Sequence, residues 1–282
     1  MTLSDQPSTS DRATPAIAWL FDVDGVLTEP ELKTVREPAL FDELIRRLAR
    51  GEPVGTNTGR SLTFLGAGLL DPLEARVPDR RLLHGLIAIG ERGSAWVTYD
   101  AAGARSEQVD TATPLSPALR DDVRALVQRP EFAAVMFFDE TKRTMISTEL
   151  RPGKTIADYE APQRALVVEL HALLARHGLA DQYRVDPTSI ATDIEYRGVG
   201  KAYGAARFAA MLEARDIRPA RYVCFGDSRS DYDMLEALLA RGDRAEMVFV
   251  GEPEQLRECD TRAVTFIQPL YASGTLAYLR AH

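Results

Sequence analysis

Continuous apolar runs that end in turn residues alternate with helix-period stretches at both ends of the chain. Residues 16–21 are all apolar and stop at Asp22, as expected for a strand buried on both faces of a parallel sheet. A helical pattern over 38–50 and a short strand over 53–57 follow. The same order returns later as a helix over 201–215, a strand over 221–225, a helix over 231–241, a strand over 246–250 and an edge strand over 264–267. Such units predict a Rossmann-like parallel α/β sheet.

The pattern changes between residues 92 and 195. The expected elements are a strand over 94–99, a helix over 116–128, a hairpin of 133–138 and 142–148, a long helix within 159–177 and strands near 183–186 and 189–196. Helices that alternate with hairpins predict an antiparallel sheet covered on one face. We therefore expect a discontinuous core of residues 15–91 and 196–282, an α+β cap inserted at 92–195, and a short disordered leader over 1–14.

Composition and charge exclude several classes of protein. With 45% hydrophobic residues the chain is too apolar to be disordered, and no apolar run approaches the ~20 residues of a membrane helix. A net charge of −8 argues against a general nucleic-acid binder. Cys224 and Cys259 form neither a disulfide framework nor a metal motif, and the N-terminus lacks the features of a secretory signal. These features indicate a cytoplasmic protein.

Polar side chains stand directly after the predicted parallel strands. In chain order they are Asp22 and Asp24, then Thr58 with Gly59 and Arg60, and then Asp227, Ser228 and Asp231. Lys201 begins a predicted helix after two glycines. Because ligands bind at the carboxyl ends of the strands in open α/β sheets, we expect these side chains to converge on one site.

Converging carboxylates repel one another unless cations lie between them. Mg²⁺, which prefers oxygen ligands, resolves that conflict, and Lys201, one of only four lysines among the 34 basic residues, adds positive charge. Together with the Thr58 hydroxyl, such a site suits a dianionic phosphoryl group. Two Asp residues at this spacing can divide the work, because one attacks phosphorus while the other protonates the leaving oxygen and later activates water.

The four segments also match a known set of motifs. Residues 22–28 (DVDGVLT), 57–60 (NTGR), Lys201 and 226–231 (GDSRSD) resemble, in order, the four motifs of the haloacid dehalogenase (HAD) superfamily phosphatases. An insertion between the second and third motifs resembles the subclass-B cap of the Cof, sucrose- and trehalose-phosphate phosphatase and phosphomannomutase group. Residues 89–94 (IGERGS) also resemble the Glu-Asn-Gly or Glu-His-Gly stretch that leads into the cap of those enzymes.

This resemblance implies a Mg²⁺-dependent phosphatase that hydrolyses a small phosphorylated metabolite, a sugar phosphate or similar polyol phosphate, through an aspartyl-phosphate. It implies that Asp22 is the nucleophile, that Asp24 is the general acid and base, and that Thr58 and Lys201 bind the phosphoryl oxygens. The implied metal ligands are Asp22, the main-chain carbonyl of Asp24, Asp227 and Asp231. The expected substrate contacts are Thr58, Gly59, Arg60, Lys201, Ser228 and Arg197.

Two other functions stay open at this point. Residues 20–30 also resemble a phosphomannomutase-like phosphosugar mutase, and the same fold can serve a non-catalytic binding protein. Single motifs have simpler interpretations as well, since Asp and Gly are common in turns and Asp231 suits the start of a helix. Ser230 stands where the fourth motif often has Asn. The basic cap residues are most simply interpreted as a solvated polar face: Lys142, Arg143, Arg151 and Lys154.

Overall fold

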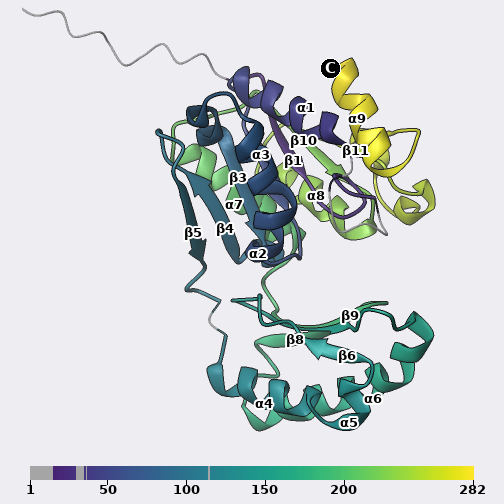
Figure 1. Ribbon diagram of the computed structural model, residues 1–282. Coiled ribbons are helices and arrows are strands. Elements are labelled where there is room, and N and C mark those ends of the chain that lie inside the picture. Colours follow the sequence, from purple (N-terminus) through teal and green to yellow (C-terminus); the bar gives the residue numbers. More distant parts are fainter. Residues whose placement is uncertain (1–14, 30–34, 36, 114) are drawn as a thin grey trace, which may run out of the picture.

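The computed structural model describes residues 15–29, 35, 37–113 and 115–282. These residues build an eight-stranded sheet and a separate four-stranded sheet (Figure 1). The strand order is β12-β11-β10-β1-β2-β3-β4-β5 in the large sheet and β6-β7-β9-β8 in the small one. The leader expected over residues 1–14 lies outside the described residues.

Six neighbouring strands of the large sheet are parallel. They are β1 (Ile17–Phe21), β2 (Val54–Asn57), β3 (Leu86–Gly90), β10 (Arg221–Gly226), β11 (Ala245–Phe249) and β12 (Val264–Phe266). Phe21 at the end of β1 is level with Thr56 of β2 and with Phe225 of β10. The residues that follow these three strands therefore emerge together at one edge of the sheet.

Helices cover both faces of the parallel strands, which explains why the strands read as continuous apolar runs. On one face lie α1 (Pro38–Ala49), the helical stretch of α2 (Leu62–Leu65), Gly66–Leu70 and α3 (Asp71–Arg76), and α9 (Tyr271–Ala281). On the other lie α7 (Lys201–Glu213) and α8 (Tyr232–Ala240) (Figure 1). Alternate residues of β1 serve the two cores, since Trp19 and Phe21 pack on the α1 side and Ala18 and Leu20 on the α7 side.

Short 3₁₀ turns complete this sheet and its connections: Arg80–Gly85, Glu91–Gly93, Arg229–Asp231, Pro253–Leu256 and Thr261–Ala263. The strand expected over 94–99 forms as β4 (Ala95–Tyr99), but it pairs antiparallel with β3 and carries β5 (Arg105–Val109) on its other side. Strand pairing thus keeps residues 95–109 with the core, contrary to the expected boundary at residue 92. The reason is burial, because Ala95, Val97 and Tyr99 belong to the same apolar core as the stretch 62–76.

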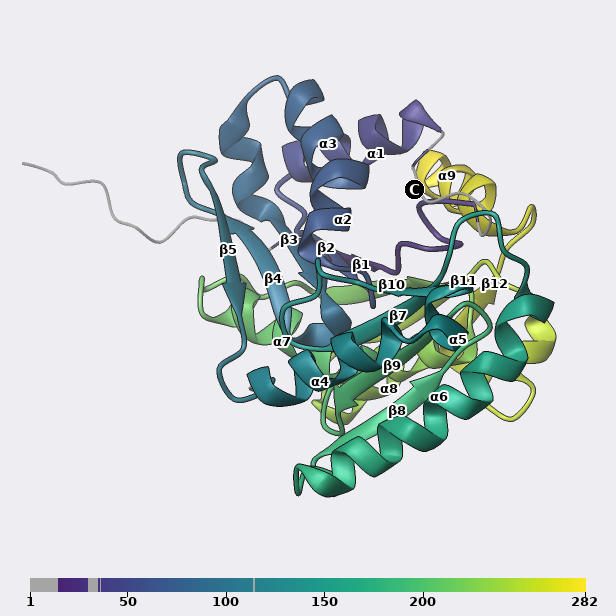
Figure 2. The ribbon, with the colours of Figure 1, turned by 60° about the horizontal axis from the view of Figure 1, so that its bottom comes forward.

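The small sheet is antiparallel, as expected. It consists of β6 (Met136–Phe138), β7 (Ile146–Leu150), β8 (Tyr183–Pro187) and β9 (Ala191–Tyr196). Three helices cover the face turned away from the large sheet: α4 (Pro117–Val127), α5 (Pro130–Ala133) and α6 (Ile156–Arg176) (Figures 1 and 2). The other face is turned towards the core. Within the described ranges, none of the helices has both the length and the apolar character needed to cross a bilayer.

Candidate active site

Lys201 marks the point where three strand ends and a helix start meet. Its Nζ lies 2.6 Å from Asp22 Oδ1 and 2.5 Å from Asp231 Oδ1, and it donates a 2.8 Å hydrogen bond to the carbonyl of Asn57. The amide of Asp22 in turn donates to the carbonyl of Phe225 at 3.0 Å. The ends of β1, β2 and β10 and the first residue of α7 therefore come together, as the sequence predicts for these motif residues.

Three carboxylates form a compact acidic group beside this ammonium. Oxygens of Asp22, Asp227 and Asp231 all lie within 4.8 Å of one another. Burial, followed by the charges of Asp231 and Asp24, holds the pKa of Asp22 well above its usual range although Lys201 lowers it. Burial and Asp231 likewise raise the pKa of Asp227 to about 7. One ammonium thus leaves negative charge uncompensated, and this all-oxygen group suits a hard divalent cation such as Mg²⁺.

Glycine and serine hold the acidic group in place. Gly25 has a φ of +74°, and a Cβ there would lie 2.0 Å from Asp227 Oδ2, so the turn after β1 passes directly against this carboxylate. The fully buried Asp231 accepts hydrogen bonds at Oδ2 from the amide and the hydroxyl of Ser228, at 3.0 and 2.7 Å. Ser228, expected as a substrate contact, thus directs its hydroxyl to Asp231.

Asp24 stands apart from the acidic group. Its carboxylate, about 35% exposed, accepts two hydrogen bonds from Arg60, at 2.9 Å from Nε and 2.8 Å from Nη2. This bidentate pair occupies both carboxylate oxygens of Asp24. Arg60, expected to contact substrate, also lies over the ring of Phe64 at 4.5 Å from its centroid.

Thr58 and Arg197, two more of the expected substrate contacts, differ in their position. Thr58 is buried at the end of β2, where its amide donates to the carbonyl of Ile89 at 3.1 Å and its hydroxyl accepts from the Arg60 amide at 3.3 Å. Arg197 is exposed and donates to the carbonyl of Ala180 at 3.1 Å, so its described contact lies within the cap and away from the acidic group.

Comparison with known proteins identifies the fold. No family model matches the chain, and no curated protein matches it significantly. A trehalose-6-phosphate phosphatase from Aspergillus fumigatus is 18% identical, with 95% of this chain and 92% of that chain covered at a TM-score of 0.56. A sucrose-phosphatase from Synechocystis, in complex with sucrose and phosphate, is 16% identical. The match covers 95% of this chain and 98% of that chain, with a TM-score of 0.55. A haloacid dehalogenase-like hydrolase from Bacteroides thetaiotaomicron is 11% identical. That match covers 95% of this chain and 99% of the other chain, with a TM-score of 0.64.

The chain has the HAD fold with an inserted cap. This confirms the fold expected from the four motifs, with the smaller sheet and its helices as the cap of the subclass-B type. At these identities the likeness establishes the fold alone, and the chemistry of the site is argued below from its own residues.

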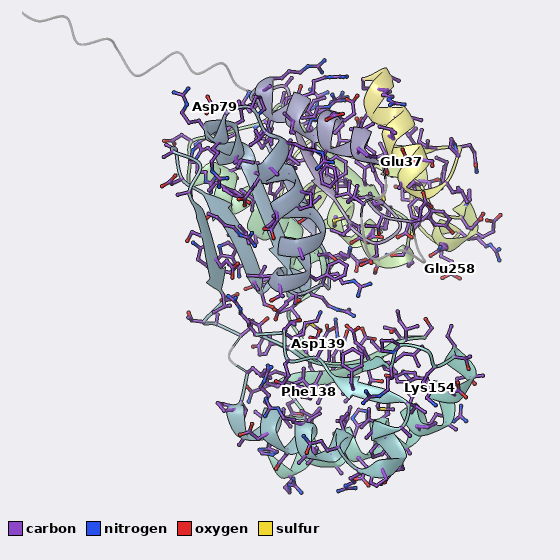
Figure 3. All side chains as sticks on the ribbon, viewed as in Figure 1. Glu37, Asp79, Phe138, Asp139, Lys154 and Glu258 are labelled. Atoms are coloured by element: carbon purple, nitrogen blue, oxygen red, sulfur yellow. The ribbon has the colours of Figure 1, made fainter. Side chains whose placement is uncertain are left out.

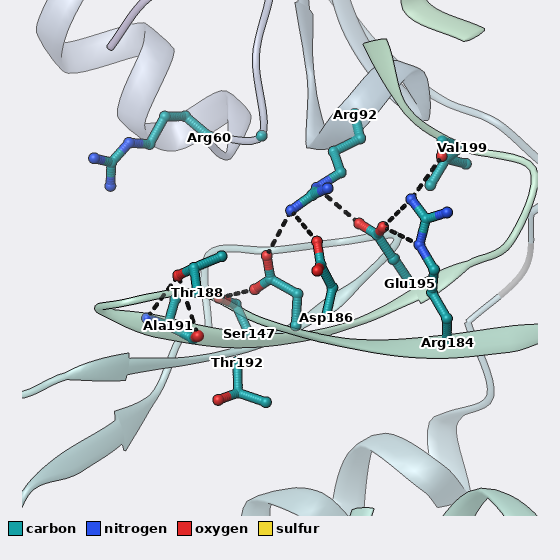
Figure 4. Close-up of polar contacts among 12 residues, drawn as sticks. Arg60, Arg92, Ser147, Arg184, Asp186, Thr188, Ala191, Thr192, Glu195 and Val199 are labelled. Carbon is teal, nitrogen blue, oxygen red and sulfur yellow. Dashed lines mark hydrogen bonds and ion pairs between the residues drawn. The ribbon is translucent and has the colours of Figure 1, made fainter. Parts of the chain in front are cut away.

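The HAD core and the cap are joined by an ionic cluster that the motifs did not predict. Arg92, in the core, lies 2.8 Å from Asp186, 3.4 Å from Asp193 and 2.7 Å from Glu195, all on cap strands (Figure 4). Glu195 is fully buried and also pairs with Arg184 at 2.5 Å. Burial holds the pKa of Glu195 above its usual range although both arginines lower it. The signal in the sequence was Arg92 itself, which stands where the resembling stretch has Asn or His.

A cavity of about 310 Å³ lies between the HAD core and the cap. The core side is lined by Arg60, Ser61 and Phe64, and the cap side by Phe137, Asp139 and Thr141 among others. Asp139 lies on the side of the cap that faces the core (Figure 3). Because Arg60 both lines this cavity and binds Asp24, the cavity lies next to the Arg60–Asp24 pair.

Lys142 lies in surroundings that differ from the expected ones. A solvated face was the simplest expectation, yet this side chain is only 5% exposed and its Nζ donates to the carbonyl of Gly59. Its position depends on the contact between cap and core, so no local pattern around residue 142 could indicate it.

Proposed function

We propose that this protein is a Mg²⁺-dependent phosphomonoester hydrolase that uses Asp22 as its nucleophile. The observation that carries the proposal is the surroundings of Asp22. Its carboxylate stands at the carboxyl end of β1 and pairs with Lys201 at 2.6 Å. One of its oxygens lies within 4.8 Å of oxygens of Asp227 and Asp231. This combination of an oxygen-only acidic group and a buried ammonium suits the charge of a phosphoryl group.

In the first step, an Asp22 oxygen attacks phosphorus, and the bond from phosphorus to the ester oxygen breaks. Asp24 donates a proton to that leaving oxygen, so it must first be protonated and exchange one Arg60 hydrogen bond for the substrate. Thr58 and Lys201 hold the phosphoryl oxygens. A bound Mg²⁺ would offset the negative charge of the acidic group and of the phosphoryl oxygens.

In the second step, water attacks phosphorus of the aspartyl-phosphate while Asp24 accepts its proton. The bond between phosphorus and Asp22 breaks, which releases inorganic phosphate and restores the carboxylate. The order of these steps requires Asp24 to act as an acid and then as a base, a task suited to a side chain that is partly exposed and next to the cavity.

We further propose that the leaving group is a small sugar or a similar polyol. A cavity of about 310 Å³ has room for such a group, and it offers carboxylate and hydroxyl oxygens together with aromatic rings. Sucrose-phosphatase and trehalose-6-phosphate phosphatase, which share the fold, carry sugar phosphates in their names. We also propose residues 111–199 as the inserted cap, and the two free cysteines support a reducing compartment such as the cytoplasm.

The test begins with hydrolysis of an aryl phosphate with Mg²⁺ or with EDTA. We expect activity only with Mg²⁺, and a loss of more than about 10³-fold in Asp22→Asn because the attacking oxygen is replaced. The matched control is Asp233→Asn, since Asp233 is half-exposed and pairs with Arg229 at 2.8 Å outside the acidic group. Full activity of Asp22→Asn, or no wild-type activity on a broad panel of phosphomonoesters, would refute the proposal.

Incubation with a hexose 1-phosphate separates the hydrolase from a mutase. The proposal requires release of inorganic phosphate, whereas a mutase forms the 6-phosphate. A screen of phosphorylated metabolites then identifies the leaving group.

A further inference from the structure

Residues 58–60 form a short catalytic loop whose three carbonyls each accept one hydrogen bond. The carbonyl of Thr58 accepts from the amide of Arg92 at 3.0 Å, and that of Arg60 accepts from the amide of Glu91 at 2.9 Å. The carbonyl between them, that of Gly59, accepts from Lys142 Nζ. The first two donors belong to the core, and the third comes from the cap. All three carbonyls of this loop are therefore paired only when the cap is docked.

Lys142 belongs to a docking loop, residues 141–144, that is bound to the core on both sides of this contact. Before it, the hydroxyl of Thr141 lies 2.7 Å from the hydroxyl of Ser61. After it, the buried carboxylate of Glu91 accepts hydrogen bonds from two successive amides, those of Arg143 at 2.9 Å and Thr144 at 2.7 Å. The Thr144 hydroxyl adds a third, also at 2.7 Å. The docking loop is thus held firmly enough to fix the direction of the Lys142 side chain.

The Lys142 ammonium is buried, which is unusual for a lysine in a surface contact. The side chain is 5% exposed, and among the described residues its ammonium meets a carbonyl and is in no ion pair with a carboxylate. Desolvation of an ammonium is costly unless strong hydrogen bonds replace water. A charged donor on a single carbonyl gives a short, directional bond, which suits a role in fixing a peptide group.

We propose that Lys142 is a positioning residue, which fixes the Gly59 peptide and through it the directions of Thr58 and Arg60. Thr58 directly follows Asn57, whose carbonyl accepts the Lys201 hydrogen bond, and Arg60 holds Asp24. In the proposed mechanism both neighbours of Gly59 therefore act on the reaction. Lys142 itself touches neither the acidic group nor Asp24. The catalytic consequence rests on the proposed hydrolase function, whereas the fixing of the loop does not depend on it.

The experiment compares Lys142→Met and Lys142→Arg with Lys154→Met, because Lys154 is an exposed cap lysine. Steady-state kinetics with an aryl phosphate give kcat and KM. Hydrogen exchange of the backbone amides of residues 58–61, in the absence of substrate, measures how firmly the loop is held. We expect Lys142→Met to lower kcat about 10- to 100-fold with little change in KM, since small misplacements of catalytic groups have effects of this size. Exchange at 58–61 should be faster in the same variant, Lys142→Arg should recover most of both, and Lys154→Met should match wild type.

Two results overturn the proposal. One is wild-type kcat or wild-type exchange in folded Lys142→Met, and the other is a raised KM with unchanged exchange, which would make Lys142 a substrate contact. If Lys142→Met does not fold, Thr141→Val weakens the same docking loop and must reduce kcat and protection at 58–61 in the same sense. If the wild type is inactive, the proposed function fails while the exchange comparison still decides the role of Lys142.

Discussion

Two glycines with nearly the same backbone conformation isolate the role of one close contact in the site. Gly25 and Gly51 have φ values of +74° and +73°, in the region that side chains other than glycine rarely adopt. A Cβ at Gly51 would meet nothing within 4 Å, whereas a Cβ at Gly25 would lie 2.0 Å from Asp227 Oδ2. Gly25→Ala and Gly51→Ala should therefore introduce similar backbone strain, and only Gly25→Ala adds a clash with Asp227.

The expected sizes follow from these geometries. Each alanine costs roughly 1–2 kcal/mol of stability for the left-handed conformation. In Gly25→Ala, the carboxylate of Asp227 must in addition move by about 1 Å, because Cβ atoms essentially never come closer than 3.0 Å to such an atom. A displacement of that size in a group of the site costs on the order of 10²-fold in rate. Gly25→Ala should therefore lose activity about 100-fold beyond Gly51→Ala at similar stability.

Urea unfolding followed by circular dichroism gives the stabilities, and hydrolysis of an aryl phosphate over a Mg²⁺ series gives the activities. We expect Gly25→Ala to require more Mg²⁺ for half-maximal rate as well, because Asp227 is one of the three grouped carboxylates. If Gly25→Ala stays within about threefold of Gly51→Ala in both kcat/KM and Mg²⁺ requirement, the position of Asp227 does not depend on Gly25 and the reasoning is wrong.

Two further predictions concern the junction of core and cap. Burial raises the pKa of Asp110, but the hydrogen bonds from Tyr203 and from the amide of Ala112 and the ion pair with Arg207 outweigh it, so the pKa lies below its ordinary value. The stabilisation is therefore full above about pH 4 and is lost as the pH falls through the lower folded-state pKa. Asp110→Asn should lower the free energy of unfolding by about 1.5–3 kcal/mol at pH 7, as measured by urea unfolding. The difference in stability between wild type and variant should become smaller below pH 4. A difference that grows in acid would contradict this. Arg92→Ala removes the core partner of three cap carboxylates. The resulting fall in kcat/KM should be at least about tenfold larger for a bulky phosphomonoester than for a small aryl phosphate, a difference of ~1.4 kcal/mol. Arg129→Ala, which breaks a long pair within the cap, is the control, and an equal fall for both substrates would count against the role of Arg92.

The acidic group could be predicted because each of its members is marked by a local pattern. Asp22 and Asp227 directly follow apolar strands, and the rule that ligands gather at the carboxyl ends of parallel strands brings these strand ends together without further information. Lys201 begins a helix after two glycines, which local sequence also shows. The fold class follows from the same patterns, since buried parallel strands and exposed hairpins leave different periodicities.

The parts that could not be predicted depend on contacts distant in sequence. β5 (Arg105–Val109) reads as polar because it is an edge strand with largely exposed side chains, so no apolar alternation marks it. The helical stretch over 62–76 contains Gly66, Gly68 and Pro72, residues that are poor helix formers. The burial of Lys142 and the Arg92 cluster arise only where the cap meets the core.

The chain leaves the core after β5 and returns to it over residues 197–200. Asp110, the residue after β5, binds Tyr203 and Arg207 of α7, the helix that follows the return, so the two junctions lie close together. A segment with adjacent ends can be exchanged as a single cassette without rethreading the sheet. Asp22 and Asp227 lie outside that segment, so a core that receives another cap would keep its acidic group. If the proposed function holds, the preference for the leaving group would then change with the cap. The new cap would still have to supply a hydrogen-bond donor for the carbonyl of Gly59, which sets a concrete requirement for exchanging such caps.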